Sequence, residues 1–435
     1  MPYGERDTLE PLSVALGTEP TVPTILLLAP SFPPATTPGA ARVASFVDEF
    51  RRRTWRTVVL TAGEGNGRGD DVIELRHVEA GPVQRVLAPL RMSRVATTLR
   101  IPDAHAVWLV RAVRAAQRLH RTEHFDLVIS SALPASASLA GAVIAARLGI
   151  PHVADFRDPW SFNPYYVWPT RAHQRIDALL EGRVVSSAAA VLAPSPEMVD
   201  ALVSRHPSAR AKAHVVLNGV EEHLIREVDD GPAGGDEFVI TTVRSPYVQR
   251  RQRWPYYFHG DVDSFVSTPQ VLIRSLEQTG LSVPVRVRVV GSDARDVDVA
   301  GAREAGIAVD FEPRVDRQRA LYVMVDTDLI FHPVASNVHV HPRGIAIATR
   351  LYEYLATGRE LVIAAGDGAS RDLGSRFPGV YVINPGDSDA LSSVLRERVD
   401  AWRAHGRGFY PRPDVPTREA AAVQVADLLA GLTNG

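Results

Sequence analysis

The chain alternates short, continuously apolar runs with longer segments in which apolar residues recur every three to four positions. Short apolar runs are typical of strands buried on both faces, and the periodic segments are typical of helices that cover a sheet. The candidate strands are residues 24–29, 57–60, 125–130, 151–155, 190–193 and 213–217, and then 238–242, 285–290, 309–311, 328–331 and 360–364. This pattern predicts an α/β fold with parallel sheets.

The alternation stops once, over residues 221–237, where acidic residues and glycine replace the apolar runs. Such a change in composition is typical of a linker between two folded units. We therefore expect an N-terminal domain over residues 23–220 and a C-terminal domain over 238–412. A last helical segment, residues 413–435, follows them.

Composition narrows the classes of function. The 435 residues, 45% of them hydrophobic, are enough for more than one core. With 48 basic and 50 acidic side chains the formal net charge is -2, so we expect no nucleic-acid partner. The chain has no cysteine, which excludes disulfides, thiolate metal sites and thiol catalysis.

The N-terminus and the apolar runs bear on location. Residues 1–22 lack the basic start and apolar stretch of a signal peptide, and we expect a loose extension. No apolar run reaches the roughly 20 residues that span a bilayer. The arginine-rich stretch from Arg85 to Arg121 favours a solvated helical face over an acidic lipid surface. We expect a cytoplasmic monomer or homodimer whose membrane contact is peripheral at most.

Four stretches, in this order and spacing, resemble a known family. They are Ala29–Pro34 with Gly39–Arg42, then Gly149–Trp160, Val216–Val220 and Thr349–Gly358. Together they resemble family 4 glycosyltransferases of the GT-B fold over residues 24 to 432. The resemblance implies two Rossmann-like domains facing across a cleft. The second domain would hold a nucleotide-sugar donor, the first an acceptor, and the final helix would cross back onto the first domain.

The resemblance also implies a mechanism. Sugar transfer would retain the anomeric configuration, and the departing phosphate would take the acceptor proton on the same face. No cofactor is implied besides the nucleotide diphosphate sugar, expected to be GDP- or UDP-linked, and no metal. The acceptor would be a small molecule, as in specialised-metabolite (antibiotic-type) biosynthesis, or a glycan, as in surface-polysaccharide biosynthesis; the composition slightly favours the former.

The donor site has a physical basis apart from the resemblance. The segment 334–347 leads into a helix that begins near Ala348, so unpaired N–H groups and the positive dipole end would face a diphosphate. On this helix Glu353 would be costly to bury without a partner, and a ribose diol would satisfy its oxygens. The alternative is an ion pair of Glu353 with Arg350 or Arg359.

Other donor contacts are expected at the ends of the candidate strands. Arg244 ends a strand, and its guanidinium can bind two phosphate oxygens at once, although a surface arginine is the alternative. The base is expected near residues 311–314. The remaining candidates are Gly39, Gly291, Arg314, His332, Arg343, Gly344, Arg350 and Leu351. Gly39 would let the backbone approach the donor sugar, or would only form a turn.

One position departs from the family. Many relatives carry a second glutamate eight residues before the ribose-binding one, and this chain has Ile345 there. No carboxylate is therefore available at that position to contact the donor sugar.

The acceptor site is expected after the strand at 151–155. Asp155, Arg157 and Asp158 place three charged side chains at its carboxyl end, where they can orient an acceptor hydroxyl. Asp158 is the candidate positioning group or weak base, with Arg157 as its charge partner or a donor contact. The alternative is a salt bridge between Arg157 and Asp155 that only fixes the loop.

Motifs of other kinds of site are either absent or stand in an unsuitable context. Asp326 with Asp328, and Asp261 with Asp263, have the spacing of a metal-binding acidic motif, but the first pair leads directly into an apolar strand. His332, His339 and His341 lack the further ligands of a zinc site. No NTPase phosphate loop and no nucleophile elbow is present. A sugar-nucleotide epimerase or hydrolase on the same fold and a non-catalytic scaffold subunit stay open as alternatives.

Overall fold

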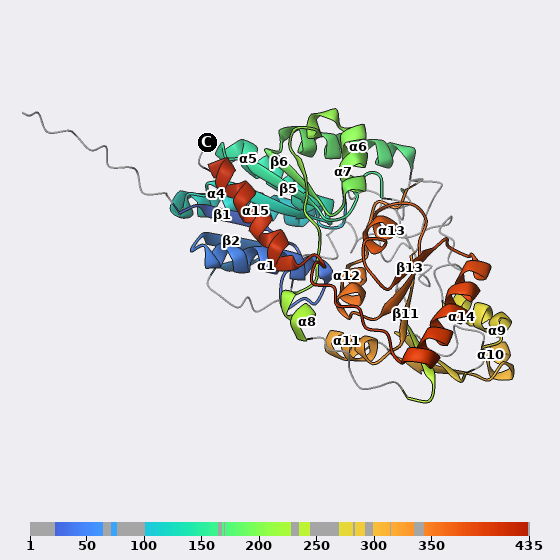
Figure 1. Cartoon of the computed structure of the whole chain (residues 1–435). Coiled ribbons are helices and arrows are strands. Elements are labelled where there is room, and N and C mark those ends of the chain that lie inside the picture. The colour runs from blue at the N-terminus through green and yellow to red at the C-terminus, as the bar shows by residue number, and fades with distance from the viewer. Residues whose placement is uncertain are drawn as a thin grey trace, which may run out of the picture.

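The structure is a computed structural model. It describes residues 22–63, 71–75, 101–163, 168, 170–227, 235–243, 269–281, 283–291, 299–313, 315–334 and 343–433. Its strands form two parallel sheets, one from each half of the chain, and helices cover both faces of each (Figure 1). The α/β class predicted from the sequence is confirmed. Within the described residues, no helix is both long and apolar enough to cross a membrane.

The first sheet has seven strands in the order β3-β2-β1-β4-β5-β6-β7. Their bounds are β1 Thr24–Leu28, β2 Arg56–Thr61, β3 Val72–Glu74, β4 Leu127–Ala132, β5 His152–Phe156, β6 Ala190–Ala193 and β7 Ala213–Val215. Ile25 to Leu28 are completely buried because this central strand is covered on both faces. The chain order reverses beside β1, and such a reversal is where open α/β sheets place ligands.

The helices of the first unit lie in two layers. They are α1 Pro38–Arg52, α4 Ala106–Glu123, α5 Ala135–Leu148, α6 Arg171–Ser187 and α7 Pro196–Arg205, with a 3-10 turn η1 Pro207–Ala209. Buried residues of α1 pack on one face of the sheet, and those of α4 to α7 pack on the other.

The second sheet has six strands in the order β10-β9-β8-β11-β12-β13. Their bounds are β8 Phe238–Val243, β9 Val285–Val290, β10 Ile307–Glu312, β11 Leu329–Pro333, β12 Glu360–Ala364 and β13 Val380–Ile383. The helices of this half are α8 Glu222–Glu227, α9 Pro269–Thr279, α10 Ala300–Glu304, α11 Arg317–Val325, α12 Thr349–Ala356, α13 Ala369–Gly374 and α14 Ser388–His405. One core contains residues of α9, α10 and α14, and the other contains residues of α11, α12 and α13.

The last helix, α15 Arg418–Thr433, lies on the first unit, although it follows the second in sequence. Figure 1 shows it alongside α1. Ala422, Val425, Ala426 and Leu429 are completely buried in the same cluster as the apolar side chains of α1 and β1. The chain therefore crosses between the two units twice, once near Val220 and once before Arg418, and the two crossings pair at the Val220–Thr417 bridge.

Several elements differ from the prediction. The edge strands β3 and β13 were not predicted, and the segment 221–237 begins with helix α8 instead of an irregular linker. Residues 1–21 and 228–234 lie outside the described residues.

Candidate functional site

The carboxyl ends of the two sheets meet. Ser195, which follows β6 and caps α7, donates a hydrogen bond of 2.6 Å from Oγ to the carbonyl oxygen of Ile345, which precedes α12. Ile345 is buried in an apolar cluster of the first unit that includes Phe156 and Trp160. The segment that leads into the expected donor helix thus packs on the unit that carries the expected acceptor site.

This packing explains why an apolar residue suits position 345, where many relatives of the resembled family carry a glutamate. Its side chain is 2% exposed and surrounded by apolar groups, where a carboxylate would lose its hydration. An isoleucine contributes to the contact between the units instead.

The first turn of α12 begins close to where it was expected. Ala348 precedes the helix in extended conformation, and no side chain caps the exposed amides. Arg350 is half-buried and donates from Nη1 to the carbonyl oxygen of Val243 at the end of β8, 2.9 Å away. The start of α12 therefore lies beside the last residue before Arg244, which itself lies outside the described residues.

Leu351 was expected to contact the donor, and the structure contradicts this. Its side chain is completely buried in the core between α12 and the sheet, and its N–H donates to the carbonyl oxygen of Ala348. The apolar position that the helix period assigns to Leu351 packs inward, so the residue stabilises the helix.

His332 lies on β11, close to the same helix. Its ring is 5% exposed and packs edge-on against Tyr354, with 5.1 Å between ring centroids. Burial, together with the neighbouring charge of Arg350, lowers the pKa of His332 to about 3, so the imidazole is neutral near pH 7. Its Nε2 atom has no hydrogen-bond partner, which leaves one buried polar atom for a ligand to satisfy.

Glu353 forms an ion pair, but with neither of the two arginines that the sequence suggested. Arg317, at the start of α11, donates from Nε to Glu353 Oε1 at 2.8 Å, while Arg359 donates from Nε to the carbonyl oxygen of Val325. The Glu353 side chain is 15% exposed. Its expected contact with a ribose remains a prediction.

Arg317 also connects Glu353 to the crossing between the units. Its two terminal nitrogens donate to both carboxylate oxygens of Glu221, and Arg418 at the start of α15 donates to the same carboxylate. Burial raises the pKa of Glu221, but the two arginines lower it more, so the net shift is downward. Four side chains of alternating charge thus connect α12, α11 and both crossings.

Arg343 and Gly344 lie in the segment before α12, and both have partners. Arg343 Nη2 is 2.8 Å from Asp372 and 4.0 Å from Glu197 on α7, so it adds a second polar contact between the units. Gly344 pairs with the backbone next to Gly368, where a side chain at Gly368 would overlap with the Gly344 backbone.

Gly291 follows β9 with a φ of 82° and donates its N–H to the carbonyl oxygen of Glu312 at 2.8 Å. It therefore lies at the carboxyl edge of the second sheet, next to the segment expected to hold the base. Arg314 lies outside the described residues.

Asp155 does not take part in a solvent-facing cluster, and the expectation of a catalytic role for it is wrong. It is completely buried, and Arg42 on α1 donates to both carboxylate oxygens, with Nη2 2.9 Å from Oδ1. Arg42 also donates to the carbonyl oxygen of Val216 and to Asn218 Oδ1. The alternative salt bridge between Asp155 and Arg157 is not formed either, because Asp155 pairs with Arg42.

Arg157 and Asp158 remain at the carboxyl edge of the first sheet. Arg157 donates from Nη2 to the carbonyl oxygen of Leu133 at 2.7 Å, and its Nη1 is 4.0 Å from Asp158 Oδ2. Gly39 makes room for this arginine, since a side chain there would overlap with the guanidinium. The space that was assigned to a donor sugar beside Gly39 is thus occupied by Arg157.

The Asp158 side chain is half-exposed to solvent but lies close to other protein groups. Its side chain is 49% exposed, yet burial raises its pKa, while Arg157 acts in the opposite direction and Asp155 adds to the rise. Asp158 is thus a half-exposed carboxylate at the carboxyl edge of the first sheet. This geometry suits a group that meets an acceptor.

Two arginines central to the site were missed as site residues. Arg42 lies one turn after Gly39, among the apolar positions that α1 turns toward the sheet, and a charge there needs a buried partner. A charged residue on the buried face of this helix could therefore have been recognised from the sequence as one that needs a buried partner. Nothing local marks Arg317, whose partners lie 36 and 96 residues away along the chain.

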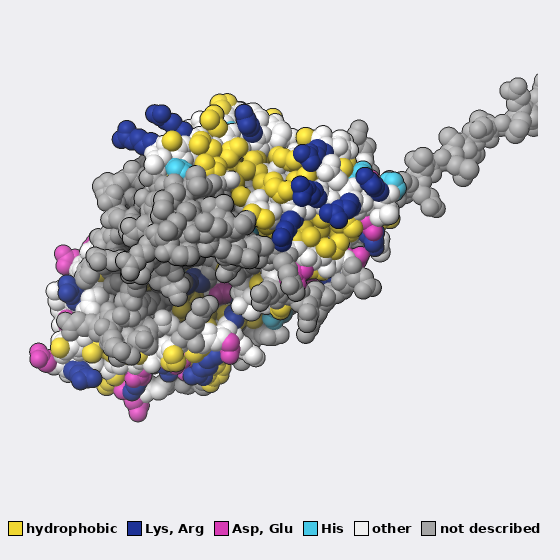
Figure 2. Space-filling model, turned by 180° about the vertical axis from the view of Figure 1, so that it is seen from behind, with side chains coloured by type: hydrophobic (Ala, Val, Ile, Leu, Met, Phe, Trp, Pro, Cys, Tyr) yellow, Lys and Arg dark blue, Asp and Glu magenta, His cyan; other side chains and the backbone are white. Residues whose placement is uncertain are grey.

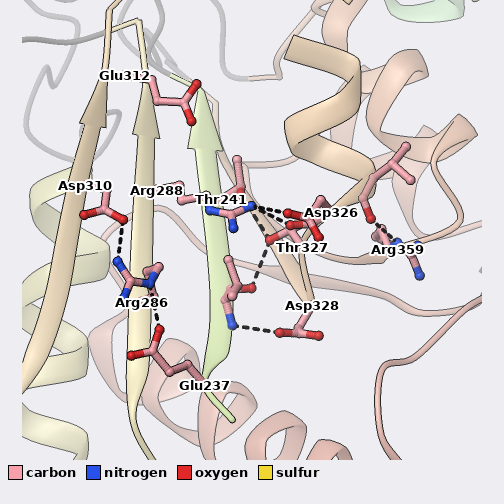
Figure 3. A network of polar contacts seen from close by, with 12 residues as sticks. Glu237, Thr241, Arg286, Arg288, Asp310, Glu312, Asp326, Thr327, Asp328 and Arg359 are labelled. Atoms are coloured by element: carbon pink, nitrogen blue, oxygen red, sulfur yellow. Dashed lines mark hydrogen bonds and ion pairs between the residues drawn. The ribbon is translucent and has the colours of Figure 1, made fainter. Parts of the chain in front are cut away.

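The acidic pair at Asp326 and Asp328 has structural partners (Figure 3). Arg288 Nη1 lies 3.0 Å from Asp326 Oδ2, and the N–H of Val239 donates to Asp328 Oδ2 at 2.8 Å. Arg407 Nε is 2.9 Å from the other oxygen of Asp328. The pair joins the helix-to-strand turn to β8 and β9. The second pair, Asp261 and Asp263, and the histidines His339 and His341 lie outside the described residues.

Comparisons with known proteins bear on the fold of the chain. Residues 39–219 match the model of the glycosyl transferase 4-like domain. The sucrose-phosphate synthase of Thermosynechococcus elongatus is similar in structure, with a TM-score of 0.57 and 16% identity over 94% of this chain and 99% of that one. The lipopolysaccharide outer core galactosyltransferase WaaB has a TM-score of 0.54 and 13% identity, covering 94% and 97%.

A UDP-N-acetylglucosamine 2-epimerase is also similar, with a TM-score of 0.50 and 12% identity over 94% of this chain and 95% of that one. A comparison with curated proteins finds no match. At these identities the structural likeness establishes the fold and leaves the reaction to be argued from the site.

Proposed function

We propose that this chain, a family 4-like glycosyltransferase of the GT-B fold, transfers a sugar from a nucleotide diphosphate sugar to a small-molecule or glycan acceptor. One observation carries the proposal. The uncapped start of α12 and the unsatisfied Nε2 atom of His332 lie at the carboxyl edge of the second sheet. The Ser195–Ile345 hydrogen bond holds this edge against the edge that carries Asp158.

The second unit would bind the donor. The amides at the start of α12 and the guanidinium of Arg350 would face the diphosphate, because a helix N-terminus and a fixed cation both favour an anion. Neutral His332 would donate from Nε2 to a phosphate oxygen. Glu353, oriented by Arg317, would accept hydrogen bonds from the ribose hydroxyls.

The first unit would bind the acceptor. Asp158 would orient the attacking hydroxyl, and Arg157 beside it would offset the charge of the carboxylate. Transfer would retain the anomeric configuration, with the departing diphosphate taking the acceptor proton. No metal would be needed, because the helix start and Arg350 would stabilise the leaving group.

A thermal-shift panel with UDP, GDP, ADP and dTDP is the first experiment. Binding of one diphosphate should raise the melting temperature of the wild type. Glu353→Gln should reduce that shift, and Arg396→Gln, which replaces an exposed arginine of α14, should leave it unchanged. A protein that no diphosphate stabilises would contradict the proposal.

Turnover of the nucleotide sugar that corresponds to the stabilising base then separates the functions. A transferase releases nucleotide only as fast as an acceptor is glycosylated, and EDTA leaves its rate unchanged. An epimerase converts the donor sugar without an acceptor, a hydrolase releases free sugar, and a scaffold releases nothing. Asp158→Asn should lower kcat and leave the diphosphate-induced shift intact.

A further inference from the structure

The outer surface of the first unit has an unusual distribution of charge and apolar area. Within the described residues, four of the seven large hydrophobic side chains that are exposed lie on α4 and α6. Val107 and Val110 are 44% and 45% exposed on α4, and Ile176 and Leu179 are 37% and 68% exposed on α6. Helix α5 lies between these two helices and contacts both.

Helices α4 and α6 each present exposed residues at helical spacing, and α5 between them is half-buried. On α4 the exposed positions Val107, Val110, Arg111, Arg114, Arg118 and Arg121 recur at helical spacing, and Thr122 near the helix end is also exposed. On α5 Leu139, Ala142 and Val143 are half-buried against the core, and Ala146 and Arg147 are exposed. On α6 the exposed positions include Arg171, Ala172, Gln174, Arg175, Ile176, Leu179 and Arg183. Apart from Arg147, these positions of α5 carry no polar side chain.

No exposed carboxylate balances these arginines on the three helices. Asp177 and Glu181 of α6 are buried, and Glu123 at the end of α4 forms an ion pair with Arg56. Arg114, Arg118 and Arg121 have no carboxylate partner among the described residues. This local excess is unlike the chain as a whole, which has 48 basic and 50 acidic side chains.

A solvated helical face would carry both signs of charge and few large apolar groups. Here apolar side chains gather between arginines, and Figure 2 shows this face over the first unit, seen from behind. An apolar area rimmed by guanidiniums is complementary to an anionic lipid surface. The arginines can contact headgroups, and the valines and leucine can enter the boundary with the acyl chains.

We propose that the face formed by α4, α5 and α6 docks this chain on an anionic membrane surface. The sequence alone favoured a solvated face, because it showed the arginines but not which apolar residues stand beside them. Binding would be peripheral and reversible, through Val107, Val110 and Leu179 with the surrounding arginines. This inference is independent of the proposed reaction, since none of these residues belongs to the donor or acceptor site.

Co-sedimentation of the full chain with lipid vesicles tests the proposal. The protein should pellet with vesicles of phosphatidylcholine mixed with phosphatidylglycerol and stay in solution with phosphatidylcholine alone. Added salt should release it, since surface charges are screened over roughly 10 Å at 0.1 M salt. Each lost arginine should lower the partition coefficient about fivefold, so the triple variant R114Q/R118Q/R121Q should lose on the order of 100-fold.

Matched variants separate docking from general charge. R303Q/R396Q/R403Q removes three exposed arginines from the second unit and should keep wild-type binding. Leu179→Ser tests the apolar contribution and should weaken binding to anionic vesicles while leaving the melting temperature unchanged. Replacing the three α4 arginines by lysine should restore binding.

Three outcomes would overturn the proposal. The first is a wild-type protein that does not pellet with anionic vesicles, and the second is equal binding by the two triple arginine variants. The third is a dimer in light scattering that Leu179→Ser dissociates, which would show that a second copy covers this face.

Discussion

Arg317 donates from Nε to Glu353 Oε1 at 2.8 Å, and through this contact the expected ribose ligand is joined to both crossings between the two units. The guanidinium occupies one carboxylate oxygen and leaves Oε2 for a ribose hydroxyl. A carboxylate fixed in this way loses less side-chain entropy when the ligand binds than a free one would. We therefore treat Arg317 as a positioning residue for Glu353.

The first prediction concerns this pair. Glu353→Gln should weaken nucleotide diphosphate binding about 10- to 100-fold, because a hydrogen bond to a charged group contributes about 1.5–3 kcal/mol. Arg317→Gln should weaken it less, since the carboxylate remains but loses its orientation. Titration calorimetry with the diphosphate measures both, and Arg396→Gln at an exposed position of α14 is the control. If Glu353→Gln binds as tightly as the wild type, Glu353 is not the ribose ligand.

The second prediction concerns the buried pair of Arg42 and Asp155. Asp155→Ala should lower the free energy of unfolding by about 3–5 kcal/mol, because the buried guanidinium of Arg42 would lose its counter-charge. Asp48→Ala removes an exposed partner of Arg51 and should change stability by about 1 kcal/mol or less. Urea denaturation followed by far-UV circular dichroism compares the variants. Similar midpoints for the two would contradict the structural role of Asp155.

More of the fold than of the candidate site could be predicted from the sequence. The strands at 190–193, 285–290 and 360–364 were predicted with the bounds observed. The first and third are short, mainly apolar runs, and the second alternates valine with arginine at the two-residue period of a strand. The edge strand β3 has three residues, too few to show a period. The acceptor-side cluster was wrong at Asp155, because its partner Arg42 lies 113 residues away and periodicity does not report contacts across a sheet.

On the donor side, too, a local feature was predicted and a long-range contact was not. The start of α12 was predicted within one residue, since it depends on local sequence. The partner of Glu353 was not, because it depends on how α11 packs beside α12.

The third prediction is a dependence of stability on pH that comes from Asp177. The pKa of Asp177 is raised to about 6, mainly by burial and also by Asp103 and Glu181, against the opposing hydrogen bond from Trp168. A carboxyl group whose pKa is higher in the folded state stabilises the fold below its unfolded pKa. That contribution is lost as the pH rises through about 6.

Asp177→Asn removes the charge and can still accept the hydrogen bond from Trp168. The variant should therefore melt at a higher temperature than the wild type near pH 8, and the difference should vanish near pH 4. Melting curves across this range measure it. The reverse trend, with the variant less stable near pH 8, would show that the charged form of Asp177 stabilises the fold.

The fourth prediction concerns Ile345, where relatives of the resembled family often carry a glutamate. Ile345→Glu would place a carboxylate among Phe156, Trp160 and other apolar side chains of the first unit. It should destabilise the protein by about 3 kcal/mol or more and weaken donor binding, because the segment before α12 would leave its contact with Ser195. Ile345→Val keeps the apolar contact and should cost only about 0.5–1.5 kcal/mol. Urea denaturation and diphosphate titration of both variants check this, and a stable Ile345→Glu protein that binds the donor more tightly would show that the segment does not pack on the first unit.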